Sequence, residues 1–378
     1  MNVLFVTTKN PYSNKPFGGG AETSCRLIGK NLSALGHGVS YLADEVEQSS
    51  LATARKENVS LFGFNQSLFS RFHSSRLTRL LSILQIVHTN KIDIIYCFFE
   101  LKNLETILNV KKVFPKVRVV MRMAGLAWHE KITNRQKLKS RYENAFSGVD
   151  SVNFIHENLP EMVAKKLNDL KMSVSFKHSF ILDIGTKVST HVDLEDRSDG
   201  TLRMVMASRF ADYHKRQDIL VRAMALVPQD LPVTLTFIGE GKRLDENRSA
   251  ARELGLEDKV FFEPFLPQEQ LWRRLAECNL LCHCADYEGL GKTVVESMTM
   301  GLPVLVSDVS PLNAYVQDGV TGFLAPNTPE DWAKKISEIA SDLGRLSVIS
   351  NQSQEYAEKN FNDTQRGKEY EQEFLNLI

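Results

Sequence analysis

The chain is poor in cysteine for its length. Its 378 residues include five cysteines, an odd number without the spacing of a disulfide framework. Three of them, Cys278, Cys282 and Cys284, lie close to His283 in the sequence, which would suit a metal ion. Alternate side chains of a strand point to opposite faces, however, so His283 points away from Cys282 and Cys284. We therefore expect reduced cysteines in a hydrophobic core.

A long apolar run is also missing. Nothing approaches the roughly 18 consecutive apolar residues of a membrane-spanning helix. The first apolar run, residues 3–6, is too short for a signal sequence and predicts a strand instead. We expect a soluble or peripheral protein in the cytoplasm, and leave open an association with the inner face of the membrane.

The chain carries no net charge, but its charges are unevenly distributed. Residues 1–195 contain 26 Lys and Arg against 17 Asp and Glu, a net charge of +9, and residues 196–378 contain 20 against 29, a net charge of −9. A basic first half suits an anionic membrane surface or a phosphate-bearing acceptor. A scatter of solvated lysines is the alternative.

Both halves of the chain alternate strands and helices. The first half opens with a strand at residues 3–7, a loop that ends in three glycines at 18–20, a helix to residue 35 and a strand at 39–42. A second series begins with a strand at 202–207 and a helix at 215–226, and continues to residue 262. This order predicts parallel sheets, so we expect an α/β fold. The polar stretch 182–200 predicts a linker, which places domains at 1–195 and 196–359 and a last helix at 360–378.

The segment 282–308 carries the most informative pattern. It reads CHCADYEGLGKTVVESMTMGLPVLVSD and places Glu288 and Glu296 eight positions apart. The pattern predicts a strand, a glycine-rich turn, a helix at 294–300 and a second strand. Such a turn presents free N–H groups and a positive helix N-terminus, which bind anions. Carboxylates accept hydrogen bonds from hydroxyls, so the pattern indicates a ligand with both phosphates and hydroxyls, such as a nucleotide sugar.

This segment resembles the E-x7-E motif of the retaining glycosyltransferases with the GT-B fold (glycosyltransferase family 4-like, glycosyl transferases group 1). The opening strand, the GGG loop and the LGHGV stretch resemble the start of the same proteins. The resemblance implies two Rossmann-like domains facing across a cleft, with the last helix packed on the first domain. It also implies that Glu288 contacts the sugar and Glu296 the ribose, with the residues between them at the donor: Gly289, Leu290, Gly291, Lys292 and Thr293. Lys292 departs from the apolar residue of many relatives, and a phosphate contact and a solvated lysine are equally compatible with it.

An arginine and a lysine follow the first strand of the second domain. Arg209 stands at the carboxyl end of that strand and Lys215 six residues later, where open α/β sheets bind ligands. Both can neutralise a diphosphate. By resemblance, Arg209 and Lys215 hold the diphosphate and stabilise the leaving group. Gly239 then lies in a second glycine turn near the nucleotide and Phe265 in a base-side loop, where Pro264 replaces a frequent glycine and leaves the base open.

The resemblance also assigns residues of the first domain to the donor. Gly19 and Gly20 would lie near the donor phosphate. A dinucleotide-binding loop is the competing interpretation, but Thr23 stands where its third glycine is needed. Many family members have a histidine near the reacting sugar at the place of Ala124. His129 is the nearby candidate for this role, with packing of His129 as the alternative. Arg122 is a second candidate residue, for a contact with a phosphate or the acceptor.

Two basic segments of the first domain suit an acceptor or a membrane. A predicted helix beside the expected cleft carries Lys131, Arg135, Lys137, Lys139 and Arg141. Residues 68–88 combine arginines with apolar residues at helical spacing. Such a helix can rest on anionic lipid, but we favour packing of its apolar face on the sheet.

We expect a retaining glycosyltransferase that moves a sugar from a nucleoside diphosphate, UDP or GDP, to a hydroxyl of a saccharide or lipid-linked acceptor. By family resemblance, it would act in cell-surface polysaccharide or glycolipid biosynthesis. The sequence has no acidic D-x-D cluster, so we expect basic residues and backbone to neutralise the phosphates, without a metal or other cofactor. We expect no nucleic-acid partner. Two alternatives stay open: a GT-B-type nucleotide-sugar epimerase and a non-catalytic nucleotide-sugar-binding protein.

Overall fold

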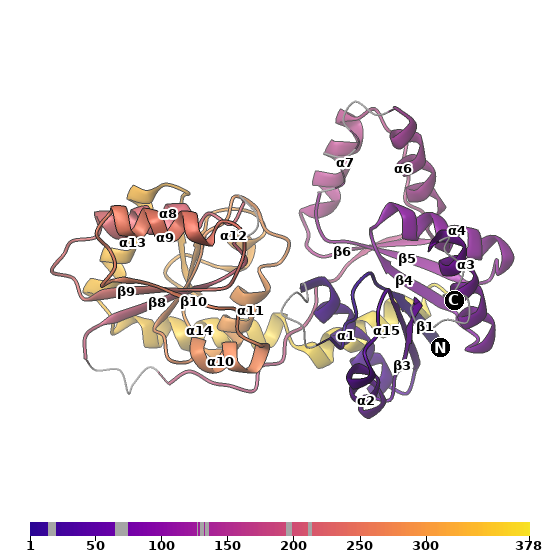
Figure 1. The fold of residues 1–378 in the computed structure, drawn as a ribbon, viewed down its shortest axis with the longest axis horizontal. Helices are drawn as coiled ribbons and strands as arrows, with labels where there is room; N and C mark the ends of the chain where they lie inside the picture. The colour runs from indigo at the N-terminus through magenta and orange to yellow at the C-terminus, as the bar shows by residue number, and fades with distance from the viewer. Residues whose placement is uncertain are drawn as a thin grey trace. The chain divides into compact units, whose positions relative to one another are not determined.

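The computed structural model describes residues 1–13, 20–64, 75–126, 128, 132, 136–193, 199–210 and 214–378. It divides the chain into two compact units, shown in Figure 1. Unit 1 comprises Met1–Gly185 and Asp363–Ile378, and unit 2 comprises Thr186–Asn362. The chain therefore passes between the units twice, whereas the sequence placed the two crossings after residues 195 and 359.

Unit 1 contains a seven-stranded parallel sheet of order β3-β2-β1-β4-β5-β6-β7. The strands are β1 Asn2–Val6, β2 Gly38–Ala43, β3 Ser60–Gly63, β4 Ile94–Phe98, β5 Arg118–Met123, β6 Ser151–Phe154 and β7 Ser179–Ile181. The helices are α1 Gly20–Ala34, α2 Gln48–Lys56, α3 Ser75–Thr89, α4 Leu101–Val113, α6 Gln136–Gly148, α7 Leu159–Asp169 and α15 Asp363–Leu375. The central strands are buried along most of their length because helices cover both faces of a parallel sheet.

Unit 2 contains a six-stranded parallel sheet of order β10-β9-β8-β11-β12-β13. The strands are β8 Leu202–Ala207, β9 Val233–Ile238, β10 Val260–Glu263, β11 Leu280–His283, β12 Val304–Ser307 and β13 Phe323–Ala325. The helices are α8 Gln217–Leu226, α9 Leu244–Glu253, α10 Gln268–Leu275, α11 Lys292–Met300, α12 Leu312–Tyr315, α13 Pro329–Ser341 and α14 Arg345–Asn360. Two parallel α/β sheets confirm the predicted fold class.

Each sheet reverses its direction of strand addition once. In unit 2, β9 and β10 are added on one side of β8, and β11, β12 and β13 on the other. The switch point therefore lies between β8 and β11. In unit 1 the corresponding point lies between β1 and β4. Loops that leave neighbouring strands in opposite directions open a crevice at the carboxyl ends, which is where such sheets bind ligands.

The core of unit 2 has two layers, one on each face of the sheet. Cys282, Cys284 and Trp332 belong to one apolar cluster, whereas Leu281 and Val295 of α11 belong to the other. All five cysteines of the chain are buried and free, as predicted. Among the described residues, no helix is both long and apolar enough to span a membrane.

The last helix, α15, belongs to unit 1 and packs against α1 (Figure 1). Close packing needs Gly367, because a Cβ atom there would lie 2.6 Å from the Cβ atom of Asn31. The Asn31 amide donates to the Asp363 carbonyl at 2.7 Å, and His37 Nε2 lies 2.6 Å from Glu371 Oε1. These contacts fix the helix across a gap of more than three hundred residues in sequence.

A buried arginine forms the deepest attachment of α15. Arg122 of β5 is 3 % exposed, and its Nη1 donates to the hydroxyl of Tyr370 at 2.8 Å, to Tyr96 at 3.1 Å and to Asn153 Oδ1 at 3.3 Å. The Tyr370 hydroxyl lies 3.0 Å from the carbonyl of Leu182. A buried charge must be satisfied by hydrogen bonds, so this network stabilises the docked helix.

Replacing Tyr370 by Phe should lower the free energy of unfolding of unit 1 by about 1–3 kcal/mol, because it leaves the buried Arg122 with one partner fewer. Urea unfolding of the two proteins measures the difference. Tyr287, which is 58 % exposed, provides the matched Tyr→Phe control and should change stability little. Equal stability of Tyr370→Phe and the wild type would show that this hydroxyl does not support the arginine.

Candidate functional site

Two loops pair with each other at the switch point of unit 2. The loop after β8 and the loop after β11 are joined by backbone hydrogen bonds from Arg216 N to Cys284 O (3.1 Å) and from Asp286 N to His214 O (2.8 Å). Arg216 Nη1 adds a bond of 3.0 Å to Asp286 Oδ1. The predicted helix at 215–226 therefore begins later, at Gln217, because the backbone before it pairs with the other loop.

This pairing brings Lys215 and Glu288 together. The Lys215 ammonium donates to Glu288 Oε1, and both side chains are mostly buried, with 15 % and 12 % exposed. The two residues are 73 positions apart in sequence and follow the two strands that flank the switch point. The roles assigned from the sequence, diphosphate binding for Lys215 and sugar binding for Glu288, stay predictions. The structure places the two side chains in direct contact.

His283, the last residue of β11, completes this cluster. Its Nε2 lies 3.4 Å from Lys215 Nζ and 3.5 Å from Glu288 Oε2. Its Nδ1 is buried without a hydrogen-bond partner among the described residues. The sequence argument treated His283 only in relation to a metal, although a polar residue at the carboxyl end of a strand is a signal for a ligand site.

The surroundings of Glu288 and His283 determine which of the two side chains is charged at neutral pH. Burial alone would raise the pKa of the Glu288 carboxyl, but the adjacent Lys215 ammonium and the hydrogen bond from His283 hold this pKa well below its usual range. Burial, together with the Lys215 charge, lowers the pKa of His283. At neutral pH, Glu288 is therefore an anion beside a neutral imidazole, and it can accept hydrogen bonds from hydroxyls.

The glycine-rich turn leads directly into α11. Gly291 precedes the helix with φ +71°, and no side chain caps the first N–H groups. A Cβ atom on Gly291 would lie 2.8 Å from Leu312 Cδ2 and 3.0 Å from the Tyr315 hydroxyl, which donates to the Leu290 carbonyl. The turn is therefore fixed by α12, a contribution that the sequence did not reveal. The uncapped N–H groups make this helix end suitable for an anion.

Glu296 lies one turn further along α11 and is 2 % exposed. Lys292 Nζ lies 3.1 Å from Glu296 Oε1, and Gln268 Nε2 donates to Glu296 Oε2 at 3.2 Å. Gly289 and Thr293 are half-buried residues of the same turn and helix start. Lys292 is therefore not a solvated lysine, because its ammonium is paired within the site. No sequence pattern had pointed to Gln268.

The second glycine turn lies at the end of β9. Gly239 has φ +148°, and a Cβ atom there would lie 2.1 Å from the carbonyl oxygen of Ser208. Only glycine therefore lets this turn approach the end of β8. Arg209 follows Ser208 and is exposed, and its carbonyl accepts from Gln217 Nε2 at 3.0 Å. Phe265, after β10, is 37 % exposed.

Only some of the candidate site residues of the first domain lie among the described residues. Gly19 and His129 lie outside the described residues, as do Lys131 and Arg135, and Gly20 is the first residue of α1. Arg122 is not available for a phosphate or an acceptor, because it is buried in the network with Tyr370. Among the described residues, no group of three acidic, histidine or cysteine side chains could hold a metal ion.

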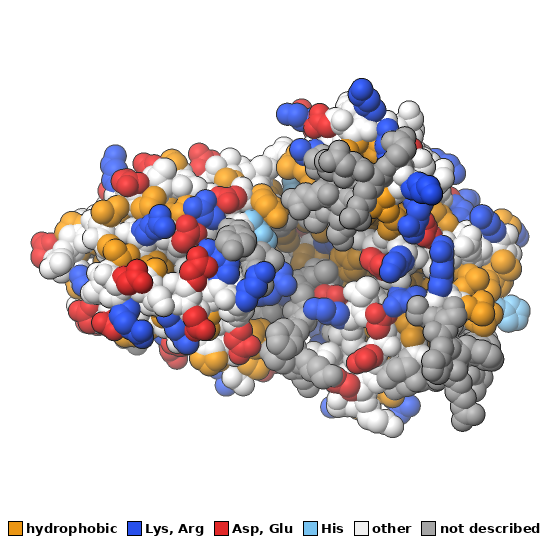
Figure 2. Space-filling model, turned by 45° about the horizontal axis from the view of Figure 1, so that its top comes forward, with side chains coloured by type: hydrophobic (Ala, Val, Ile, Leu, Met, Phe, Trp, Pro, Cys, Tyr) orange, Lys and Arg blue, Asp and Glu red, His pale blue; other side chains and the backbone are white. Residues whose placement is uncertain are grey.

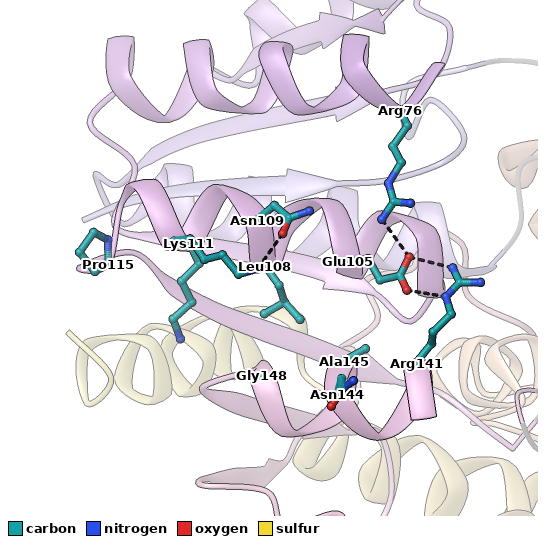
Figure 3. Close-up of a pocket in the computed structure, with 11 residues that line it drawn as sticks. Arg76, Glu105, Leu108, Asn109, Lys111, Pro115, Arg141, Asn144, Ala145 and Gly148 are labelled. Atoms are coloured by element: carbon teal, nitrogen blue, oxygen red, sulfur yellow. Dashed lines mark hydrogen bonds and ion pairs between the residues drawn. The ribbon is translucent and has the colours of Figure 1, made fainter. Parts of the chain in front are cut away.

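Unit 1 carries a groove of about 690 Å³ between α4 and α6, drawn in Figure 3. Arg141 donates to Glu105 at 2.7 and 2.8 Å, and Arg76 donates to the same carboxylate at 3.2 Å. Lys111, Lys112 and Leu108 also line the groove. Figure 2 shows acidic and basic side chains mixed over unit 2 and several Lys and Arg side chains on one face of unit 1. Lys111 also pairs with Asp150 at 2.5 Å, so four cations stand against two carboxylates and the groove stays basic.

Comparison with a family model matches residues 195–359 to "Glycosyl transferases group 1". A D-inositol 3-phosphate glycosyltransferase of Nocardia farcinica is 33 % identical over 141 residues, which cover 35 % of this chain and 31 % of that protein. An alpha-1,3/1,6-mannosyltransferase of Dictyostelium discoideum is 35 % identical over 102 residues, 27 % of this chain and 24 % of that protein. The chain thus spans about a third of the length of the first relatives it matches.

Similarity to solved structures extends over both units. HepE of Anabaena, in complex with UDP and glucose, gives a TM-score of 0.77 at 19 % identity and covers 100 % of both chains. Sucrose-phosphate synthase of Thermosynechococcus elongatus gives a TM-score of 0.80 at 18 % identity, over 100 % of this chain and 98 % of that chain. The fold is therefore the GT-B fold, as the sequence predicted.

The cluster at the switch point should make stability depend on pH. His283 and Glu288 both have a lowered pKa in the folded state. The unfolded chain therefore binds more protons, and the free energy of unfolding decreases as the pH is lowered. The loss begins below the ordinary values of 6.5 for His283 and 4.5 for Glu288. At pH 7.5, Glu288→Gln should be destabilised by about 3–5 kcal/mol, because it leaves a buried charge unpaired.

Urea unfolding of the wild type and Glu288→Gln between pH 7.5 and pH 3.5 measures this effect. The difference between the two proteins should narrow as the pH falls below 4.5, the ordinary value of a glutamate. Below this pH the unfolded wild type binds a proton at Glu288, whereas the folded state, with its lowered pKa, does not. Glu358→Gln on the exposed side of α14 is the control. A difference that stays constant with pH would contradict the buried ion pair.

Proposed function

Because residues 195–359 belong to the glycosyl transferases group 1 family, we propose that this chain is a retaining glycosyltransferase. It transfers a sugar from a nucleoside-diphosphate sugar to an acceptor hydroxyl. The observation that carries this proposal is the Lys215–Glu288 pair at the switch point of unit 2, next to the uncapped start of α11. A cation, an ionised carboxylate and uncapped N–H groups at one place suit a ligand that carries both phosphates and hydroxyls, such as a sugar diphosphate.

The proposed donor site assigns a role to each charged group. Lys215, Arg209 and the first N–H groups of α11 neutralise the diphosphate and stabilise it as a leaving group. Glu288 accepts hydrogen bonds from sugar hydroxyls, since its lowered pKa keeps it ionised. Glu296 receives the ribose. Enough positive charge surrounds the diphosphate for transfer without a metal ion.

We further propose UDP or GDP as the nucleotide. The Anabaena neighbour of similar fold is described with UDP and glucose, which supports UDP as the first nucleotide to test. The exposed ring of Phe265 follows β10 next to α10, at the place that we assign to the base. Aromatic rings offer a stacking surface that every base can use.

The acceptor is proposed to be a saccharide or a lipid-linked saccharide of cell-surface polysaccharide or glycolipid biosynthesis. Two relatives are named for an inositol phosphate and for mannosyl transfer, and a phosphate-bearing acceptor suits the basic first half of the chain. We propose that unit 1 also contacts the inner face of an anionic membrane. The groove lined by Arg76, Lys111, Lys112 and Arg141 supports this contact, because basic clusters bind anionic lipid surfaces.

An epimerase needs groups that exchange protons at the sugar near neutral pH. Glu288 is held ionised by Lys215, which favours a hydroxyl-binding role over that of a general acid. Product analysis separates the proposed transferase from both alternatives. A new glycoside identifies a transferase, an epimerised donor identifies an epimerase, and an unchanged donor that still binds identifies a nucleotide-sugar-binding protein.

Lys215→Ala and Arg209→Ala should each weaken the affinity for UDP about 10- to 150-fold, as expected for the loss of a charge-assisted contact of about 1.5–3 kcal/mol. Calorimetric titration with UDP, GDP, ADP and NAD measures the affinity. Lys334→Ala, an exposed lysine of α13, is the matched control. Unaltered dissociation constants in both variants, or binding of NAD alone, would contradict the diphosphate site.

Glu288→Gln should reduce transfer by at least about 100-fold while UDP still binds, because the carboxylate acts on the sugar and not on the nucleotide. Transfer is followed by formation of the glycoside, and nuclear magnetic resonance of the product determines whether the anomeric configuration is retained. Unchanged turnover in Glu288→Gln would refute the sugar contact, and inversion would refute the retaining mechanism.

A further inference from the structure

The carboxylate of Glu296 is held by side chains from two elements. Lys292, the first residue of α11, places its Nζ 3.1 Å from Glu296 Oε1. Gln268, the first residue of α10, donates to Glu296 Oε2 at 3.2 Å, and its own Oε1 lies 3.5 Å from Lys292 Nζ. The three side chains form a closed triangle, so the carboxylate cannot rotate without breaking a polar contact.

Lys292 stands where it does not favour the helix. The N-terminus of a helix carries positive partial charge, which disfavours a cation in the first turn. A lysine that precedes a glutamate by four residues is also the weaker order for a helical ion pair. Helix stability therefore does not account for Lys292. Its position is better explained by the carboxylate that it contacts, which is 2 % exposed and needs a partner.

Glu296 keeps acceptor capacity for a ligand. Its Oε1 receives no hydrogen bond of good geometry among the described residues, although the Lys292 charge lies close by. An ionised carboxylate has about four lone-pair sites, and the triangle engages Oε2 more fully than Oε1. The remaining sites can accept hydrogen bonds from a pair of neighbouring hydroxyls.

We propose that Lys292 and Gln268 orient Glu296 so that it recognises the ribose hydroxyls of the donor, which makes Lys292 a specificity-determining residue that acts through Glu296. This inference rests on the proposed function of the same site. It assigns Lys292 to the ribose and not to the diphosphate. Gln268 follows the loop of Phe265 directly, so it links the ribose contact to the segment on the proposed base side.

The ratio of two dissociation constants tests this assignment. UDP and 2′-deoxyUDP differ by one ribose hydroxyl and carry the same diphosphate. A lost hydrogen bond to a charged group corresponds to about a tenfold weaker affinity or more, so the wild type should bind UDP at least about ten times more tightly than 2′-deoxyUDP. The same pair of measurements is made with GDP and 2′-deoxyGDP.

Lys292→Met keeps most of the side-chain volume and removes the charge. In this variant the ratio should fall at least about threefold toward one, because a misoriented carboxylate gains less from the hydroxyl. Gln268→Leu should lower the ratio in the same direction. Lys292→Arg keeps a cation beside Glu296 and should retain most of the discrimination, and the exposed Lys334→Met is the matched control.

Each outcome decides between distinct possibilities. Parallel weakening of UDP and 2′-deoxyUDP at a constant ratio would show that Lys292 contacts the phosphates and would overturn the inference. Lower thermal stability at a constant ratio would show a purely structural role and would overturn it as well. If the wild type binds neither UDP nor GDP, the proposed donor site itself fails, whereas a nucleotide that binds with an unchanged ratio in Lys292→Met refutes only the role of Lys292.

Discussion

A buried ion pair holds the two sides of the unit 2 crevice together. Lys215 and Glu288 come from the loops that leave β8 and β11 in opposite directions, and the pair adds to the two backbone hydrogen bonds between these loops. Removing either partner would leave the other charge buried without a counter-ion. The free-energy cost of that unpaired charge is larger than the net stabilisation that the intact pair provides. His283 at the end of β11 contacts both members of this pair.

The charged groups of the site are paired with each other, and these pairs can be exchanged for contacts with a ligand. Each carboxylate of the E-x7-E segment has a lysine beside it, Lys215 for Glu288 and Lys292 for Glu296. On the proposed function, a diphosphate competes for Lys215 while sugar hydroxyls take up the acceptor capacity of Glu288. Charge is then redistributed without exposing an unpaired group.

In unit 1, a buried network attaches α15, a helix that is remote in sequence from the rest of the unit. Arg122 is buried among the hydroxyls of Tyr96 and Tyr370 and the amide of Asn153. Tyr96, Tyr370 and Phe374 also pack their rings against one another, with centroids 5.7–6.4 Å apart. Apolar packing supplies the attachment of α15, and the arginine network makes it specific.

The sequence by itself determined the α/β class, the two series of strands and helices, the buried cysteines and the segment that holds Glu288 and Glu296. These features follow from local periodicity, turn residues and the spacing of a motif. Only the tertiary structure decided that Lys215 lies in a loop and not in a helix, that His283 and Gln268 join the site, and that Arg122 is buried in a structural network. Such partners lie tens to hundreds of residues apart, and strand order and helix docking, which local patterns do not encode, bring them together.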